Sequence, residues 1–184
     1  KMHSTRRDAF QTVNSERIAE ITITKDGLTH NSTKSMPQRE INSPTPFSTD
    51  VKIAQFIAGP HLYSDMLKSA EENGYSAILI HGTGLGHLPI ENSNGDAPEN
   101  DELAKTIIDM SIPVIVANQC VHGPVDLNVY SKGRIQQDMG VLGHGSNASP
   151  EALLVKIHWI LSNGLDLDLL SQDLCGENSP ILNS

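Results

Sequence analysis

The chain has few cysteines, no long apolar run and no signal-like start, and each absence narrows what it can be. Its 184 residues include two cysteines, Cys120 and Cys175, which are too few and too far apart for a disulfide framework or a zinc site. No stretch approaches the roughly 18 consecutive apolar residues of a membrane span. The first residues also lack the apolar core of a signal peptide. We therefore expect reduced thiols, no membrane partner and a cytoplasmic protein.

Basic charge and aromatic side chains are also scarce. The 13 Lys and Arg residues are outnumbered by 22 Asp and Glu residues, and the net charge is −9. This balance excludes a stand-alone nucleic-acid binder, so any RNA would have to be held mainly by a partner. Aromatics make up 4% and hydrophobic residues 38% of the chain, which indicates an aliphatic core of strands buried between helices.

The first 50 residues differ in pattern from the rest. Since Met2 follows a lysine, we expect the sequence to begin inside a longer gene product. The alternating residues 18–23 predict one short strand that ends near Gly27. Residues 29–50 are rich in Ser, Thr, Asn and Pro with few apolar anchors, which is typical of an irregular linker. The first 28 residues therefore form a short arm, and 29–50 a linker.

From residue 51 onward, strand and helix patterns alternate. Apolar runs predict strands at 51–57, 77–80 and 113–117, and stripes at helical spacing lie between them, such as Leu62, Met66 and Ala70. We predict a helix over 125–139 and another that starts at Ser149-Pro150-Glu151, a capping hydroxyl followed by proline and a carboxylate. The fold class predicted for 51–184 is α/β, with a parallel sheet of three to four strands flanked by helices.

A glycine-rich run, 81–87, directly follows the second predicted strand. Glycines let a backbone turn sharply, and the carboxyl end of a parallel strand is where open α/β sheets bind ligands. The run lacks the spacing of a dinucleotide or phosphate loop. From the pattern alone, a structural turn and a ligand loop are equally good interpretations.

Other residues with chemical potential have simpler interpretations. The four histidines at element ends lack ligand spacing and an acidic cluster, so no metal site is predicted; they are His81, His87, His122 and His144. Cys120 follows the third strand, where a nucleophile could lie, but a buried small apolar side chain is the preferred interpretation.

Several motifs, taken together and in order, resemble the C-terminal domain of the asparaginase family. In chain order they are Gly82-Thr83-Gly84-Leu85-Gly86-His87-Leu88-Pro89, Ala117-Asn118-Gln119-Cys120-Val121-His122-Gly123, Val125-Asp126-Leu127-Asn128-Val129-Tyr130-Ser131-x-Gly133-Arg134, and Pro150-Glu151-Ala152. Residues 127–134 and His87 resemble more narrowly the D subunits of archaeal glutamyl-tRNA(Gln) amidotransferases. The start, Lys1-Met2-His3-Ser4-x-Arg6-Arg7-Asp8-Ala9-Phe10 with Asn14, is similar to the end of that family's amidohydrolase N-terminal domain.

This resemblance implies an enzyme component that releases ammonia from glutamine for conversion of Glu-tRNA(Gln) to Gln-tRNA(Gln). Lys1 stands at the position of a catalytic lysine that assists a threonine nucleophile, and the threonines and aspartate of the set lie upstream. The chain alone is therefore expected to be inactive. The resemblance also leaves open a type I L-asparaginase that hydrolyses asparagine, or a support domain without catalysis.

The resemblance further implies partners and contact residues. Family members form homodimers in which this domain lies close to the neighbouring active site, so Gly84, Gly86, His87 and Tyr130 are candidates for substrate or dimer contacts. The domain itself is expected to bind no cofactor, because ATP and Mg²⁺ are used by a partner, the E subunit of the amidotransferase. Three features depart from the family pattern: His81, residues 92–100 and residues 143–147.

Overall fold

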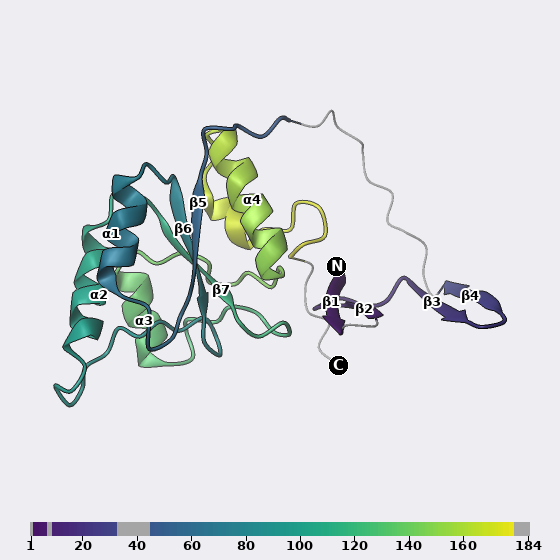
Figure 1. Cartoon of the computed structure of the whole chain (residues 1–184), viewed down its shortest axis with the longest axis horizontal. Coiled ribbons are helices and arrows are strands. Elements are labelled where there is room, and N and C mark those ends of the chain that lie inside the picture. The colour runs from purple at the N-terminus through teal and green to yellow at the C-terminus, as the bar shows by residue number, and fades with distance from the viewer. Residues whose placement is uncertain (1, 7–8, 33–44, 179–184) are drawn as a thin grey trace.

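The computed structural model describes all residues except 1, 7–8, 33–44 and 179–184. An arm of two antiparallel strand pairs precedes an α/β body (Figure 1). Strand β1 (Met2–Arg6) pairs with β2 (Ala9–Thr12), and β3 (Ala19–Thr24) pairs with β4 (Gly27–Ser32). The catalytic assignment of Lys1 falls outside the described residues.

The arm holds more regular structure than the sequence predicted. The strand expected at 18–23 is present as β3, but its partner β4 was missed, and residues 29–32 of the predicted linker belong to that strand. A two-residue turn, Lys25–Asp26, joins the pair, and Gly27 follows it with φ 128°. Every residue of β3 and β4 is exposed, so the hairpin has no buried face whose apolar residues would have marked both strands in the sequence. Residues 45–48 have no regular structure, and 33–44 lie outside the described part.

The body is a parallel sheet between helices, which confirms the predicted fold class. Its strands are β5 (Ile53–Ile57), β6 (Ala77–Gly82) and β7 (Val114–Asn118), in the order β5-β6-β7. The helices are α1 (Ser64–Glu72), α2 (Pro98–Asp109), α3 (Ser131–Asp138) and α4 (Pro150–Ser162), followed by a 3₁₀ turn, η1 (Leu167–Ser171).

The two faces of the sheet bury two separate cores. Helices α1, α2 and α3 lie on one face and α4 on the other (Figure 1). Alternate residues of β6 divide between them: Ile78 and Ile80 face the first core, whereas Ala77 and Leu79 face the second. Strands buried on both faces read as continuous apolar runs, which explains why their sequence signal was strong.

Two helical predictions need correction. The helix expected over 125–139 begins only at Ser131, because the backbone of Leu127 packs against Gly133 so closely that a Cβ there would clash with the Leu127 carbonyl. In the predicted stripe before and along α1, Leu62 and Ala70 are buried as expected, but Met66 is 38% exposed and the neighbouring Leu67 is buried instead.

Helix α4 begins as predicted and carries an unexpected buried charge. The Ser149 hydroxyl accepts a hydrogen bond from the N–H of Ala152, and Pro150 occupies the first turn. Lys156 lies on the buried face between apolar residues, where its ammonium pairs with Glu177 at 2.7 Å and donates to the carbonyl oxygen of Leu170 at 3.2 Å. The pair anchors the segment that follows η1 to α4.

Hydrogen bonding keeps the Glu177 carboxyl ionised despite its burial. Burial raises the pKa of this group, but the hydrogen bonds from Lys156 and from the N–H and thiol of Cys175 outweigh it and lower the pKa to about 2. Burial, reinforced by the Glu177 carboxylate, raises the pKa of the Cys175 thiol.

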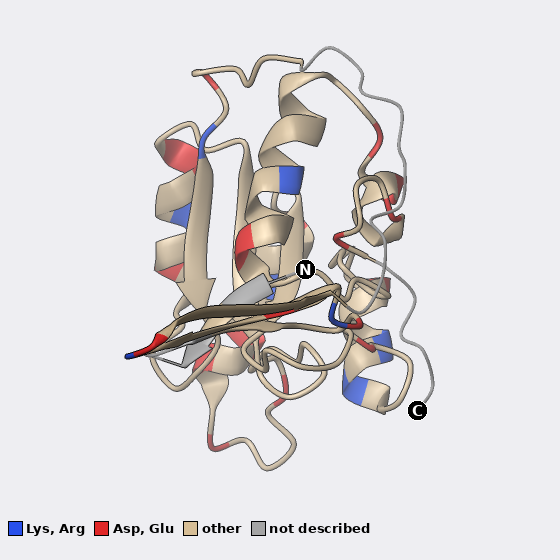
Figure 2. Cartoon of the chain, turned by 90° about the vertical axis from the view of Figure 1, so that its right-hand side faces the viewer, with Lys and Arg blue, Asp and Glu red and all other residues tan. Residues whose placement is uncertain are grey.

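Lys and Arg positions are scattered over several elements rather than gathered in one place (Figure 2). Within the described ranges, no helix is both long and apolar enough to cross a bilayer.

We predict that Lys156→Met lowers the free energy of unfolding by about 3 kcal/mol, because it leaves the Glu177 carboxylate buried without its cation. The double variant Lys156→Met/Glu177→Leu should recover most of this loss, since no charge then remains unpaired. Urea unfolding of Lys156→Met, Glu177→Leu and the double variant measures the coupling free energy between the two side chains. Additive losses would contradict the ion pair.

The same pair predicts a pH dependence. The folded pKa of Glu177 lies below its ordinary value of 4.5, so the ionised carboxylate stabilises the fold above pH 4.5, and this contribution is lost as pH falls towards 2. Glu177→Gln should therefore flatten the stability curve between pH 4.5 and 2. A curve that keeps its wild-type slope in that range would show that another group controls it.

Candidate functional site

The glycine run after β6 forms a tight turn that closes on itself. The N–H of Thr83 donates to the carbonyl of His87 at 2.9 Å, and the N–H of His87 donates back to the Thr83 carbonyl at 2.9 Å. Gly84 and Gly86 have φ of 55° and 102°, which favour glycine. A Cβ on Gly82 would clash with the Gly86 backbone. Of the two interpretations made from the sequence, the structural turn is therefore present.

Contacts from α3 and from the segment before it hold this turn in place. The buried amide of Gln136 donates to the Gly86 carbonyl at 3.1 Å and accepts from the N–H of Leu88 at 2.8 Å. A Cβ on Gly86 would lie 2.8 Å from Cγ1 of Val125. Gln136 was missed from the sequence, although a polar residue on the buried face of a helix is the signal that marks it.

His87 and Tyr130 meet at the surface beside this turn. Their ring centroids lie 5.5 Å apart, and the Tyr130 side chain is 59% exposed. The sequence predicted Tyr130 inside a helix. Instead, it is the residue before the first turn of α3 and has extended φ and ψ. Burial lowers the pKa of His87, and the Lys132 charge lowers it further against the opposing Glu91, so the imidazole is neutral near pH 7.

Two buried polar atoms near the turn have no hydrogen-bond partner among the described residues. They are Nε2 of His87 and Oδ1 of Asn118, the last residue of β7. Asn118 uses its other amide atom, which donates to the Pro124 carbonyl at 2.8 Å. Unsatisfied buried groups are uncommon, and they place unused hydrogen-bonding capacity at the carboxyl end of the sheet.

The remaining predicted residues have less chemical character. His81 is half-buried, and burial lowers its pKa against the opposing charge of Glu151. Cys120 is exposed, so its interpretation as a buried apolar side chain was wrong; the chain leaves the sheet after Asn118 and turns to the surface. In the described part of the chain, no three His, Cys, Asp or Glu side chains are grouped to hold a metal ion.

The loop 143–147, whose sequence departs from the family pattern, lies at the centre of this region. His144 Nδ1 accepts from the N–H of Leu127 at 3.1 Å, and Val125 donates its N–H to the Ser146 carbonyl at 2.8 Å. A Cβ on Gly143 would clash with the Val116 carbonyl. The loop thus ties β7 to the segment that supports the glycine turn. The other segment that departs from the family pattern, 92–100, is a loop only as far as residue 97, because Pro98 begins α2; within it, Asn92 Oδ1 accepts from the N–H of Ala97 at 2.8 Å.

Asn14 connects the arm to the same region. Its amide nitrogen donates to the Asn147 carbonyl at 2.9 Å and to the Val121 carbonyl at 3.4 Å, while its Oδ1 accepts from the N–H of Gly123 at 2.8 Å. Asn14 has φ 52°, and the neighbouring Val13 is fully buried. The sequence resemblance included Asn14 without giving it a role, and the left-handed conformation it tolerates was the available signal.

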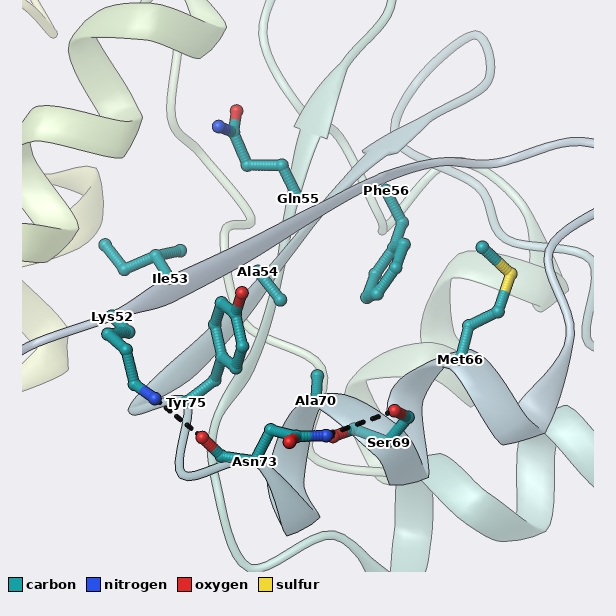
Figure 3. A pocket seen from close by; sticks show the side chains of 10 residues that line it. All are labelled: Lys52, Ile53, Ala54, Gln55, Phe56, Met66, Ser69, Ala70, Asn73 and Tyr75. Carbon is teal, nitrogen blue, oxygen red and sulfur yellow. Dashed lines mark hydrogen bonds between the residues drawn. The ribbon is translucent and has the colours of Figure 1, made fainter.

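A groove elsewhere in the body contains none of these residues. It runs between the free edge of β5 and α1 and is lined by Lys52, Ile53, Ala54, Gln55, Phe56, Met66, Ser69, Ala70, Asn73 and Tyr75 (Figure 3). Its one ammonium, Lys52 Nζ, donates to the Asn73 carbonyl at 2.6 Å and lies 5.0 Å from the centre of the Tyr75 ring. Lys52 is the one charged side chain among these lining residues, and no residue singled out from the sequence for catalysis or contact lies here, so we assign no chemistry to the groove.

Comparison with known proteins agrees with this geometry. The chain is 31% identical over 184 residues to the D subunit of the glutamyl-tRNA(Gln) amidotransferase of Methanobrevibacter smithii, covering 96% of this chain and 39% of that protein. It is 34% identical over 189 residues to the D subunit of the same amidotransferase from Methanococcus maripaludis, covering 100% of this chain and 43% of that protein. The chain thus spans about two fifths of the length of the curated relatives it matches.

Solved structures share the fold. The L-asparaginase of Thermococcus kodakarensis superposes with a TM-score of 0.68 at 24% identity, covering 99% of this chain and 52% of that one. L-asparaginase I of Vibrio cholerae gives 0.66 at 22% identity, covering 92% and 49%. The model of the glutaminase/asparaginase C-terminal domain matches residues 50–172. This chain therefore belongs to the glutaminase/asparaginase C-terminal domain family.

Proposed function

We propose that the chain is the C-terminal part of the D subunit of an amidotransferase, which releases ammonia from glutamine for the conversion of Glu-tRNA(Gln) to Gln-tRNA(Gln) in the cytoplasm. The observation that carries the proposal is the match of almost the whole chain, arm included, to proteins of that name. The arm supports it because Asn14 ties that segment to the domain.

The proposed chemistry is shared between this chain and the upstream region. A threonine hydroxyl there attacks the amide carbon of glutamine, forming an acyl-enzyme and expelling ammonia, and water then releases glutamate. Lys1 takes part by assisting the threonine, which requires an environment that lowers its pKa. The α/β domain supports the arm that carries this lysine.

The other parts of the reaction belong to a partner. Activation of the tRNA-bound glutamate needs ATP and Mg²⁺, and we assign both, together with most of the contact to tRNA, to the E subunit of the amidotransferase. The net charge of −9 and the scattered cations support this division, because phosphate backbones are bound by clustered Lys and Arg.

We further propose that the surface around the glycine turn faces a second copy of the chain. Gly84, His87 and Tyr130 would then lie against the neighbouring active site, whereas Gly86 is buried and serves to hold the turn. Exposed apolar side chains on this surface support the proposal: Val129 is 52%, Tyr130 59% and Ile135 43% exposed.

The purified 184-residue chain should release no ammonia from glutamine or asparagine, since the proposal places the acyl-forming threonines upstream of it. The full-length protein should be active, and replacement of Lys1 by alanine within it should abolish turnover. Ammonia release measures both. Turnover by the short chain, lost on changing a residue within it, would place the nucleophile here. A full-length protein that prefers asparagine and ignores Glu-tRNA(Gln) and the partner would instead be a type I asparaginase.

Tyr130→Phe in the full-length protein should raise KM about 2- to 10-fold, because one hydroxyl worth about 0.5–1.5 kcal/mol is removed while the ring remains. Tyr63→Phe is the matched control: Tyr63 also precedes the first turn of a helix with extended backbone angles, and it is 43% exposed on α1. Steady-state kinetics and thermal unfolding separate binding from folding. Equal KM values for the two variants would remove Tyr130 from the substrate site.

A further inference from the structure

The backbone of one residue in the loop before α4, Asn147, is held on both sides by asparagine side chains from distant parts of the chain. The N–H of Asn147 donates to Oδ1 of Asn178 at 3.0 Å, and its carbonyl accepts from Nδ2 of Asn14 at 2.9 Å. Asn147 and Asn178 are buried, with 6% and 7% exposure. The arm and the segment after η1 therefore meet through a single residue of this loop.

Asn178 uses its whole hydrogen-bonding capacity at this place. Its Oδ1 also accepts from the Ser146 hydroxyl at 3.1 Å and from the N–H of Ala148 at 3.0 Å. Its Nδ2 donates to the carbonyl oxygens of Leu170 at 2.7 Å and Gln172 at 3.0 Å. A buried amide with every contact satisfied fixes one geometry, since any shift leaves a buried polar atom unpaired.

The segment that carries Asn178 is itself anchored to α4. Glu177 pairs with Lys156, and its carboxylate oxygens accept from the N–H groups of Leu174 at 3.1 Å and Cys175 at 2.7 Å. Lys156 also donates to the Leu170 and Gln172 carbonyls, the two groups that accept from Asn178. Charge pair and amide thus form one buried network.

We propose that Asn178 is a positioning residue for the catalytic arm: the segment 173–178, anchored by Lys156 and Glu177, fixes loop 146–148, and this loop seats Asn14, two residues after β2. Through Asn14 the segment sets where the arm enters the amidohydrolase active site, a consequence that rests on the function proposed above. The seat itself depends only on contacts within this chain.

Asn14 is suited to be the recipient of this positioning. Its φ of 52° is costly for most side chains, and its amide bonds to both loop 146–148 and the loop after β7. An asparagine there holds the arm in a conformation that the backbone would otherwise leave. Loss of the loop geometry at Asn147 should therefore release the arm before it unfolds the sheet.

The test uses the full-length protein with Asn178→Ala and, as a matched control, Asn163→Ala. Asn163 also bonds a carbonyl through its side-chain amide, at the end of α4, where Nδ2 donates to Trp159 at 2.8 Å. Hydrogen exchange of the Gly123 N–H and of residues 9–14 reports the seat directly. We expect exchange there to rise about tenfold in Asn178→Ala and to stay unchanged in the control. In ammonia release, kcat should fall more than KM changes.

A double-mutant cycle with Asn14→Gly tests whether the two asparagines act together. Glycine accepts the positive φ, so only the side-chain hydrogen bonds of Asn14 are lost. The double variant Asn14→Gly/Asn178→Ala should exchange no faster than Asn14→Gly alone. If Asn178→Ala does not fold, Asn178→Asp takes its place: it keeps Oδ1 but sets a carboxylate oxygen against the Leu170 and Gln172 carbonyls, so exchange should again rise.

The outcomes separate the two proposals. Raised exchange with unchanged ammonia release would keep the seat and reject its catalytic use, whereas the role of Lys1 stands or falls separately with the Lys1→Ala variant. Unchanged exchange at Gly123 and 9–14 in a folded Asn178 variant would overturn the seat itself. Additive effects of the two substitutions would also overturn it, since Asn147 would then not connect them.

Discussion

Close backbone packing without side chains fixes the carboxyl end of the sheet. Gly82 packs against Gly86, Gly133 against Leu127 and Gly143 against Val116, and at each position a Cβ would clash with the backbone of the other element. The first contact closes the turn after β6, the second shapes the start of α3, and the third sets the loop before α4 against β7. Hydrogen bonds then join these segments: Gln136 of α3 bonds to Gly86 of the turn, and His144 of the loop bonds to Leu127 before α3. The candidate site is a consequence of this packing.

The body could be predicted from the sequence because its strands are buried on both faces, and α4 because its cap and proline are local signals. The arm could not be predicted in full, since its second hairpin buries no face. The start of α3 was misplaced because the helical spacing of apolar residues does not show that the Leu127 backbone packs directly against Gly133. At the site, the glycine turn was found from residue type. Asn14 and Asn178, however, bond to Asn147 across sequence separations of 133 and 31 residues, which no local pattern reveals.

A buried polar network beside α4 connects the α/β domain to the loop that contacts the arm. Lys156 interrupts an apolar stripe of α4, and its ion pair with Glu177 joins the amide network of Asn178. Replacing a buried ion pair by apolar residues is often neutral or stabilising, so stability alone does not explain one here. A geometric role does, because the network ends at the loop that receives the arm.

The central claim is that this domain serves an enzyme that moves an amide nitrogen from glutamine to tRNA-bound glutamate. Its most direct test supplies the full-length protein, its partner, ATP, Mg²⁺ and Glu-tRNA(Gln) with glutamine labelled with ¹⁵N at the amide. The account predicts ¹⁵N in the side-chain amide of Gln-tRNA(Gln). Label that appears only as free ammonia, at the same rate with and without the partner and tRNA, would contradict it.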